Sequence, residues 1–142
     1  TGDDNVSRTK VLIKQHKKIK TLINNLEKII TNEDIKTKEV AKNIRKNLSM
    51  LSGTLKIHMQ REDKFLYPEL LESDKESTKK LTKEFIEEMG DLADKFKTFN
   101  DKYKRYSIIS ENDEVFKDEL EEYLFILKNR ISREENEIYS LI

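Results

Sequence analysis

Hydrophobic residues recur along this chain in alternating steps of three and four, the spacing that turns one face of an α-helix toward a core. The pattern predicts a first helix over about residues 7–30 and a second that begins between 34 and 40. Pro68 ends the second helix or starts its last turn, because proline has no N–H to donate. The inward residues of the first are Leu12, His16, Ile19, Ile23, Leu26 and Ile30, and those of the second are Val40, Ile44, Leu48, Leu51, Leu55, His58, Glu62 and Phe65.

Two further segments carry the same stripe. The third helix opens at Ser73-Asp74-Lys75-Glu76, which predicts a capping box in which Ser73 and Glu76 satisfy free backbone N–H groups. The fourth opens at Ser110, and residues 104–112 are predicted to form the loop before it. The inward residues of the third are Leu81, Phe85, Met89, Leu92, Phe96, Phe99 and Tyr103, and those of the fourth are Phe116, Leu120, Tyr123, Leu127, Arg130, Glu134, Ile138 and Leu141.

Four such helices with short connections predict an all-α fold, an antiparallel up-and-down four-helix bundle formed by residues 1–142 as a single domain. The composition agrees, because only 3 glycines and 1 proline interrupt a chain that is 39% charged and 35% hydrophobic. So much charge is also typical of disorder. The helical spacing of the apolar residues and the net charge of zero favour a folded bundle instead.

Several classes of function are excluded by what the sequence contains. The absence of cysteine rules out disulfides and thiolate metal sites. The 28 basic and 28 acidic residues are interspersed, which predicts no nucleic-acid partner, and no apolar run is long enough to span a membrane. Because no phosphate-binding loop or catalytic cysteine is present, nothing identifies an enzyme. The chain begins with Thr1-Gly2, either a start left by cloning or a domain cut from something longer, and cytoplasm is the default location.

Five inward positions carry residues that do not suit a plain hydrophobic core: His16, His58, Glu62, Arg130 and Glu134. A single histidine on such a stripe is most often a hydrogen-bonded core residue. Buried ionisable groups are costly, however, unless they are paired or bind a metal. Counting residues from the connections places His58, Met89 and Arg130 at one level. His16 joins them if a longer link over 31–38 absorbs a surplus of roughly seven residues. With that link, both histidines are predicted to meet both carboxylates.

These residues resemble the hemerythrin-like (HHE cation-binding) domain family. The resemblance rests on His16, on His58-Met-Gln-Arg-Glu62-Asp-Lys-Phe-Leu-Tyr67-Pro68 and on Arg130-Ile-Ser-Arg-Glu134-Glu135, and it runs across almost the whole chain. Members hold two non-haem iron ions through histidines and two bridging carboxylates, and they carry oxygen, sense oxygen or iron, or respond to nitric oxide. The resemblance implies that His16 and His58 serve one ion and that Glu62 and Glu134 are the bridging carboxylates.

Two positions depart from the family pattern. Met89 stands where the family places a histidine on the third helix, and Arg130 stands where it has a histidine before the last carboxylate. Methionine sulfur is a soft ligand that suits non-haem iron poorly. Arginine has no lone pair to offer and stays protonated in proteins. The sequence therefore predicts a site for one metal ion rather than a di-iron pair.

Three interpretations remain open. In the first, His16, His58, Glu62 and Glu134 bind one non-haem iron or another divalent transition metal, with O2 or NO as a small ligand. In the second, no metal binds, Arg130 pairs with both carboxylates, and the bundle is a signalling or protein-interaction module attached to another domain of a longer chain. In the third, a histidine and Met89 hold haem, which the charges at the site disfavour.

Overall fold

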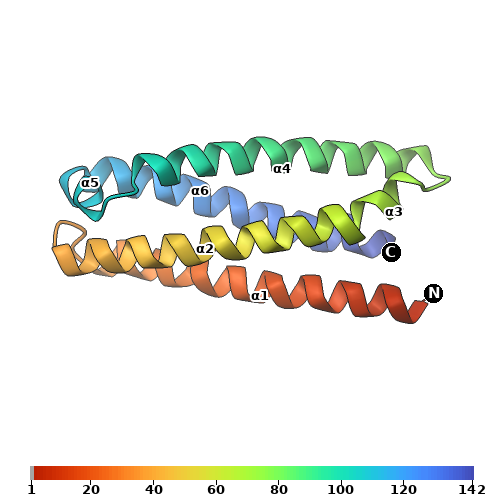
Figure 1. Ribbon diagram of the computed structural model, residues 1–142, viewed down its shortest axis with the longest axis horizontal. Helices are drawn as coiled ribbons and strands as arrows, with labels where there is room; N and C mark the ends of the chain where they lie inside the picture. Colours follow the sequence, from red (N-terminus) through yellow and green to blue (C-terminus); the bar gives the residue numbers. More distant parts are fainter. Residues whose placement is uncertain (1) are drawn as a thin grey trace.

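The computed structural model describes the backbone of residues 2–142 and the side chains of residues 9–142. Four long helices run alternately in opposite directions along the molecule (Figure 1). They are α1 (Gly2–Asn32), α2 (Lys38–Phe65), α4 (Glu76–Lys102) and α6 (Asp113–Arg133). No strand occurs among residues 2–142. The predicted antiparallel four-helix bundle is therefore confirmed.

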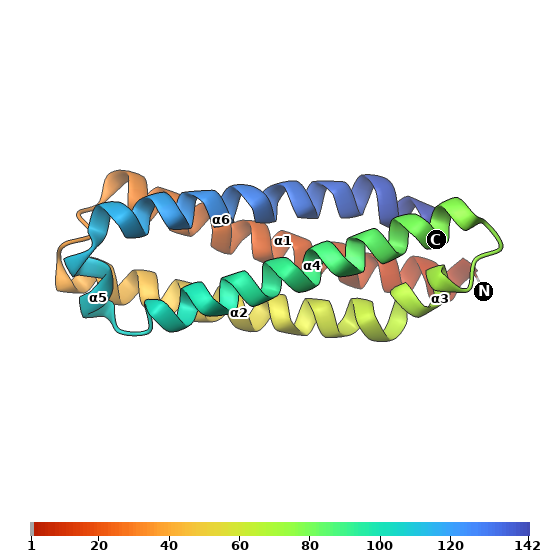
Figure 2. The same cartoon turned by 90° about the horizontal axis from the view of Figure 1, so that it is seen from above.

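Two short helices lie in the connections. Helix α3 (Tyr67–Leu71) follows α2 at the end of the bundle where both chain ends lie, and α5 (Tyr106–Glu111) lies at the opposite end (Figures 1 and 2). The prediction of a plain loop over 104–112 was wrong, because Ile109 is completely buried and anchors α5 to the core. Ser110 lies inside α5, and the fourth long helix begins at Asp113.

The predicted capping box before α4 is absent. The residue that precedes the helix is Lys75, and no side chain caps the first turn. The hydroxyl of Ser73 instead accepts a hydrogen bond from the Lys75 N–H at 3.2 Å. Ser73 therefore closes a turn ahead of the helix. Helix α2 has a true cap, because the Thr37 hydroxyl accepts from the Val40 N–H.

The second helix ends before Pro68, which was predicted to end it or to start its last turn. Helix α2 ends at Phe65, and Pro68 sits in the first turn of α3, where its missing N–H costs nothing. This break turns Phe65 outward, so the prediction that Phe65 faces the core was wrong. Leu66 and Tyr67 are buried in its place.

The fourth helix changes its geometry near its end. Helix α6 is followed by a π-helical turn, η1 (Glu134–Ile138), and by a 3₁₀ turn, η2 (Tyr139–Leu141). A π turn holds more residues than an α turn, so the inward stripe shifts along the chain. As a result Tyr139 is buried and Leu141 is exposed, the reverse of the predicted pattern. Three other residues predicted to face inward are only half-buried: Val40, Leu81 and Tyr123.

The hydrophobic core consists of two clusters with a polar layer between them. The larger cluster fills the bundle from the α5 end to the middle. The smaller one lies near α3 and contains Leu12, Leu66, Tyr67, Leu70, Phe85, Ile138 and Tyr139. Between them in sequence, on α1, α2, α6 and the start of η1, lie buried His16, His58, Glu62, Arg130 and Glu134. Burying these polar groups is unfavourable unless each one has a partner.

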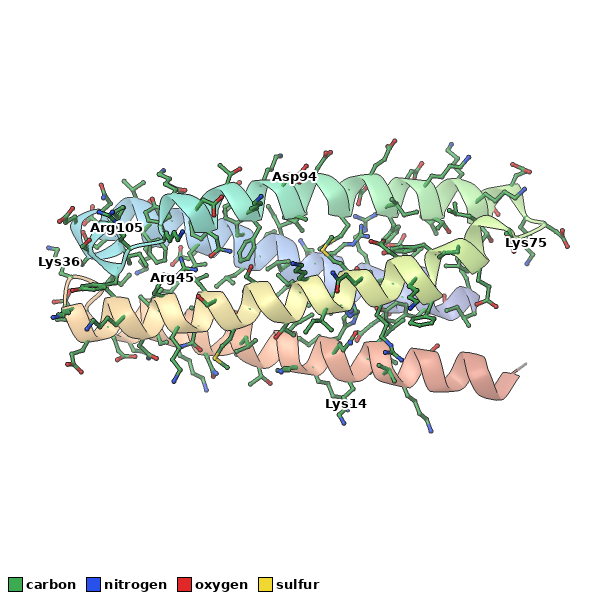
Figure 3. The ribbon with its side chains drawn as sticks, in the orientation of Figure 1. Lys14, Lys36, Arg45, Lys75, Asp94 and Arg105 are labelled. Atoms are coloured by element: carbon green, nitrogen blue, oxygen red, sulfur yellow. The ribbon has the colours of Figure 1, made fainter. Side chains whose placement is uncertain are left out.

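Charged side chains cover the outside of the bundle. Lys14, Lys75 and Asp94 project away from the helices (Figure 3). Arg45 instead turns back to the bundle: its Nη1 donates a hydrogen bond of 2.8 Å to the backbone oxygen of Tyr103, where α4 ends. Among residues 2–142, no helix combines the length and the apolar composition that crossing a bilayer requires.

Candidate metal centre

The two histidines of the chain face each other inside the polar layer. His16 lies on α1 between the buried residues Leu12 and Ile19, and His58 lies on α2 after Leu55. Both side chains are buried, and their Nε2 atoms are 3.0 Å apart. The predicted meeting of His16 and His58 is therefore confirmed.

Each histidine has a partner for its other ring nitrogen. Nδ1 of His16 lies 3.2 Å from a carboxylate oxygen of Glu135, and Nδ1 of His58 lies 2.8 Å from the side-chain oxygen of Gln15. Because both partners accept hydrogen bonds, each Nδ1 carries the hydrogen. In a neutral imidazole this leaves a lone pair on Nε2, the arrangement found in metal-binding histidines.

Two buried carboxylates complete the group. Glu62 lies one turn after His58 on α2, and its Oε1 is 3.3 Å from His58 Nε2. Glu134 opens the π turn, and its Oε2 is 3.2 Å from His16 Nε2 and 3.5 Å from His58 Nε2. Each of the four residues offers one ligand atom, and these atoms all lie within 4.8 Å of one another.

The donor set fits a single transition-metal ion. Ligand atoms that are each about 2.0–2.1 Å from a tetrahedral ion lie about 3.3 Å from one another. The two histidine nitrogens are 3.0 Å apart, and three separations between a histidine nitrogen and a carboxylate oxygen are 3.2–3.5 Å. Two imidazoles and two carboxylates are ligands that iron, zinc and manganese accept.

The histidine nitrogens and the carboxylate oxygens would repel one another in the absence of a metal ion unless some of them carry protons. Burial alone would lower the pKa of His58, but hydrogen bonds to Glu134 and Glu62 outweigh it and raise the pKa to about 9. Burial, with the adjacent Glu134 carboxylate, raises the pKa of Glu62 to about 8. Burial alone would raise the pKa of Glu134, but the hydrogen bond with Glu62 and the charge of His58 outweigh it and hold this pKa well below its ordinary value. At neutral pH the metal-free cluster therefore carries protons on His58 and Glu62.

Arg130 lies in the core, as predicted, but it contacts only one of the two carboxylates. Its Nε donates to Glu134 Oε1 at 3.0 Å. Its Nη2 donates to the backbone oxygen of Phe85 at 2.7 Å and to the Tyr67 hydroxyl at 3.3 Å. The predicted bridge from Arg130 to Glu62 was wrong, because the guanidinium turns toward α4 and α3 instead.

Met89 lies beside the cluster without joining its hydrogen bonds. It is buried on α4 and lines a pocket of about 150 Å³ between α2 and α4. Buried Glu62 forms part of the same pocket, whose rim includes the exposed residues Asp63 and Gly90. Met89 therefore packs next to the site, at the position where the sequence placed it.

Sequence reasoning missed Tyr139, which the structure places in the middle of the cluster. Its hydroxyl lies 3.0 Å from His16 Nε2 and 2.9 Å from Glu62 Oε2. Its ring stacks on His16 with an interplanar angle of 21°. Burial, with the charges of Glu134 and Glu62, raises the pKa of Tyr139, so the phenol keeps its proton in the metal-free protein.

A repeated pattern in the sequence could have pointed to this tyrosine. The segment Arg61-Glu62-x-x-x-Leu66-Tyr67 on the second helix matches Arg133-Glu134-x-x-x-Ile138-Tyr139 on the fourth. In both copies the helix geometry changes between the glutamate and the tyrosine, and the tyrosine is buried. The repetition of the whole pattern, rather than the helical period, is therefore the signal that could have indicated a buried phenol.

Comparison with known proteins agrees with this geometry. The family model described as the hemerythrin HHE cation binding domain matches residues 7–142. The chain therefore belongs to the hemerythrin HHE cation-binding domain family, and a buried histidine–glutamate cluster lies within the matched region. No curated protein and no solved structure matches the chain.

Proposed function

We propose that this protein binds one transition-metal ion through His16, His58, Glu62 and Glu134, and that the preferred ion is non-haem iron. One observation carries the proposal. The two buried Nε2 atoms face each other at 3.0 Å, while both Nδ1 atoms are engaged by outer partners. Two neutral imidazoles in this arrangement would point lone pairs at each other. The repulsion is removed by a proton on one ring or by a metal ion that accepts both lone pairs, and we propose the metal ion.

A single ion, rather than a pair, is supported by Arg130. The guanidinium donates to Glu134 Oε1, while Glu134 Oε2 faces the histidines. A permanent positive charge thus lies on the side of Glu134 away from the histidine pair. Arginine cannot coordinate a metal, so this side of the carboxylate already has its cation.

The site would serve a domain that senses or handles oxygen, nitric oxide or iron. A bound iron supplies redox chemistry and a coordination position for a small ligand. The 150 Å³ pocket lined by Met59, Glu62 and Met89 offers such a ligand a short approach between α2 and α4. Around the site, Leu12, Phe85 and Ile138 belong to the smaller core cluster, whose apolar side chains would keep bulk water away.

Metal analysis tests the proposal directly. Protein purified without chelators and loaded anaerobically with ferrous iron should contain about one ion per chain by elemental analysis. His58→Ala should remove the bound ion, whereas Gln60→Ala, on the exposed side of the same helix, should leave the content unchanged. Two ions per chain would overturn the single-ion proposal.

A metal-free role is the second candidate, and the protonation of the cluster favours it. Protons on His58 and Glu62, together with Arg130, can satisfy the buried carboxylates without any ion. The domain would then act as a signalling or protein-interaction module. Wild-type protein that binds no iron after anaerobic loading would establish this candidate over the first.

A further inference from the structure

We propose that the phenol oxygen of Tyr139 is a fifth donor to the ion held by the two histidines and two glutamates. This inference rests on the proposed metal centre and adds a ligand to it. The ion would then have two imidazole nitrogens and three oxygens, all from side chains of this chain. For a six-coordinate iron, one position would remain for a small ligand.

The distances carry the proposal. The Tyr139 hydroxyl lies 3.0 Å from Nε2 of His16 and 3.4 Å from Nε2 of His58. It also lies 2.9 Å from Glu62 Oε2 and 3.0 Å from Glu134 Oε2. One phenolic hydrogen can be donated to only one of these acceptors. The Tyr139 oxygen therefore lies at the distance from the other four side chains that a fifth ligand of the same metal ion would have.

The π turn is what brings Tyr139 into this position. In an α-helix, residues five apart point about 140° away from each other. In the π turn the Tyr139 N–H bonds to the Glu134 backbone oxygen, so the two residues stack on one face. Such turns are found frequently at functional sites. The change of helix type therefore turns both oxygen donors toward the histidines.

The second copy of the sequence pattern shows what the tyrosine does without histidine neighbours. Tyr67 follows Glu62 by the same five residues, but its hydroxyl accepts a hydrogen bond from Arg130 at 3.3 Å. No ring nitrogen lies near it among the contacts of the described residues. Tyr67 therefore offers a matched control, with the same motif, comparable burial and a cation already in place.

The chemistry of the ion fits a phenol oxygen. Phenolate and carboxylate are hard, anionic oxygen donors, which suit ferric iron better than a soft metal. On coordination the O–H bond breaks, the oxygen keeps the electron pair and binds the ion, and the proton leaves to solvent. Ferric iron bound to a phenolate absorbs visible light by charge transfer, and the ring vibrations of that phenolate appear in resonance Raman spectra.

The experiment compares wild-type protein with Tyr139→Phe and Tyr67→Phe. Each protein is loaded anaerobically with ferrous iron, oxidised with one equivalent of ferricyanide, and examined for iron content and visible and resonance Raman spectra. We expect about one iron per chain in all three. The phenolate band and ring vibrations should appear in wild-type protein and in Tyr67→Phe, and should be lost in Tyr139→Phe.

The outcomes separate the two proposals. Iron bound by wild-type protein without any phenolate signal would overturn the role of Tyr139 and leave the metal centre standing. A signal that survives in Tyr139→Phe, or disappears in Tyr67→Phe, would also overturn it. Wild-type protein that binds no iron would overturn the metal centre itself. If Tyr139→Phe fails to fold, a phenolate signal in Tyr67→Phe still assigns the ligand to Tyr139, because the other three tyrosines, Tyr103, Tyr106 and Tyr123, pack in or against the other core cluster.

Discussion

Glu134 divides its two carboxylate oxygens between Arg130 and the histidine pair. Oε1 accepts a hydrogen bond from Arg130 Nε at 3.0 Å, and Oε2 lies 3.2 Å from His16 Nε2. The Glu134 carboxylate is therefore stabilised by positive charge on two sides, one facing Arg130 and one facing the histidine pair. In one the charge is permanent and covalently part of the chain, and in the other it must come from a metal ion or from protons.

Arg130→Ala should strongly destabilise the metal-depleted protein. The change removes the partner of Glu134 Oε1 and leaves a buried carboxylate oxygen without its cation. Breaking a buried ion pair from one side typically costs about 3–5 kcal/mol. Denaturant unfolding of metal-depleted protein measures the loss.

Arg133→Ala is the matched control for this variant. Arg133 lies next to the same Phe85 ring and bonds to Glu88, as Arg130 does, but its side chain is 44% exposed. Exposed ion pairs contribute about 0–1 kcal/mol, so the control should unfold almost as wild-type protein does. Equal, small effects of both variants would show that the stem of Arg130 merely covers apolar surface.

Gln15→Ala should weaken metal binding without abolishing it. The Gln15 side-chain oxygen accepts the Nδ1–H of His58 at 2.8 Å and so fixes the ring for coordination through Nε2. Loss of such an outer partner typically lowers metal affinity about 10–100-fold. Competition with a chromophoric chelator gives the affinity, and Gln60→Ala serves again as the control. An unchanged affinity would mean that the packing of the ring alone orients it.

Metal affinity should rise with pH. The pKa of His58 is raised to about 9 and that of Glu62 to about 8, so both groups carry protons at neutral pH and must lose them when an ion binds. Each released proton makes the affinity rise up to about tenfold per pH unit below these values. Chelator competition at several pH values below 8 measures the slope, and Glu62→Gln should reduce the slope by about one proton.

Stability of the metal-free protein should change with pH in the opposite direction. His58 takes up its proton more readily in the folded state, so its contribution is full below 6.5 and is lost as the pH rises through about 9. The pKa of Glu62 is about 4.5 in the unfolded state and about 8 in the folded state, so the free energy of unfolding falls as the pH rises between these values. Thermal unfolding should therefore show lower melting temperatures at pH 9 than at pH 6.5. A rise would contradict the protonation of the cluster.

Gly53→Ala should stabilise the bundle. Gly53 lies in the middle of α2, and a methyl group added there meets no atom within 4 Å. Alanine in a helix interior is favoured over glycine by about 0.5–1 kcal/mol. Denaturant unfolding should show this gain with unchanged metal content. A destabilised variant would indicate that α2 needs flexibility at this point.

The sequence predicted the parts of the fold that follow a regular helical period. His16, His58, Glu62 and Glu134 stand in step with neighbouring apolar residues, and the structure brings them together. After a helix end or a π turn, the same helical period predicts the wrong residues to be buried. Phe65 turns outward because α2 ends there, and Tyr139 turns inward because a π turn precedes it. Such changes depend on how the chain end packs, which a fixed spacing does not encode.

The direction of Arg130 also escaped prediction for a physical reason. Counting residues from the helix connections placed Arg130 beside both glutamates. That count did not include the hydrogen-bond acceptors on other helices that compete for the guanidinium. The Phe85 backbone oxygen and the Tyr67 hydroxyl draw one end of the guanidinium away from Glu62. A planar group with five N–H donors settles where most of them find acceptors.

The π turn has a consequence for how relatives of this chain should be compared. It is equivalent to one extra residue in an otherwise continuous α-helix, and it rotates everything after it by about 100°. A homologue with one residue fewer between Glu134 and Tyr139 could be aligned across a single gap with every ligand still matched by letter. Its helix could then run as a regular α-helix, in which residues four apart lie on one face, so its phenol would still face the histidines. A homologue that kept all five residues but lacked the π turn would match letter for letter, yet its phenol would point about 140° away from the glutamate. Helix type and spacing together therefore decide where the tyrosine points.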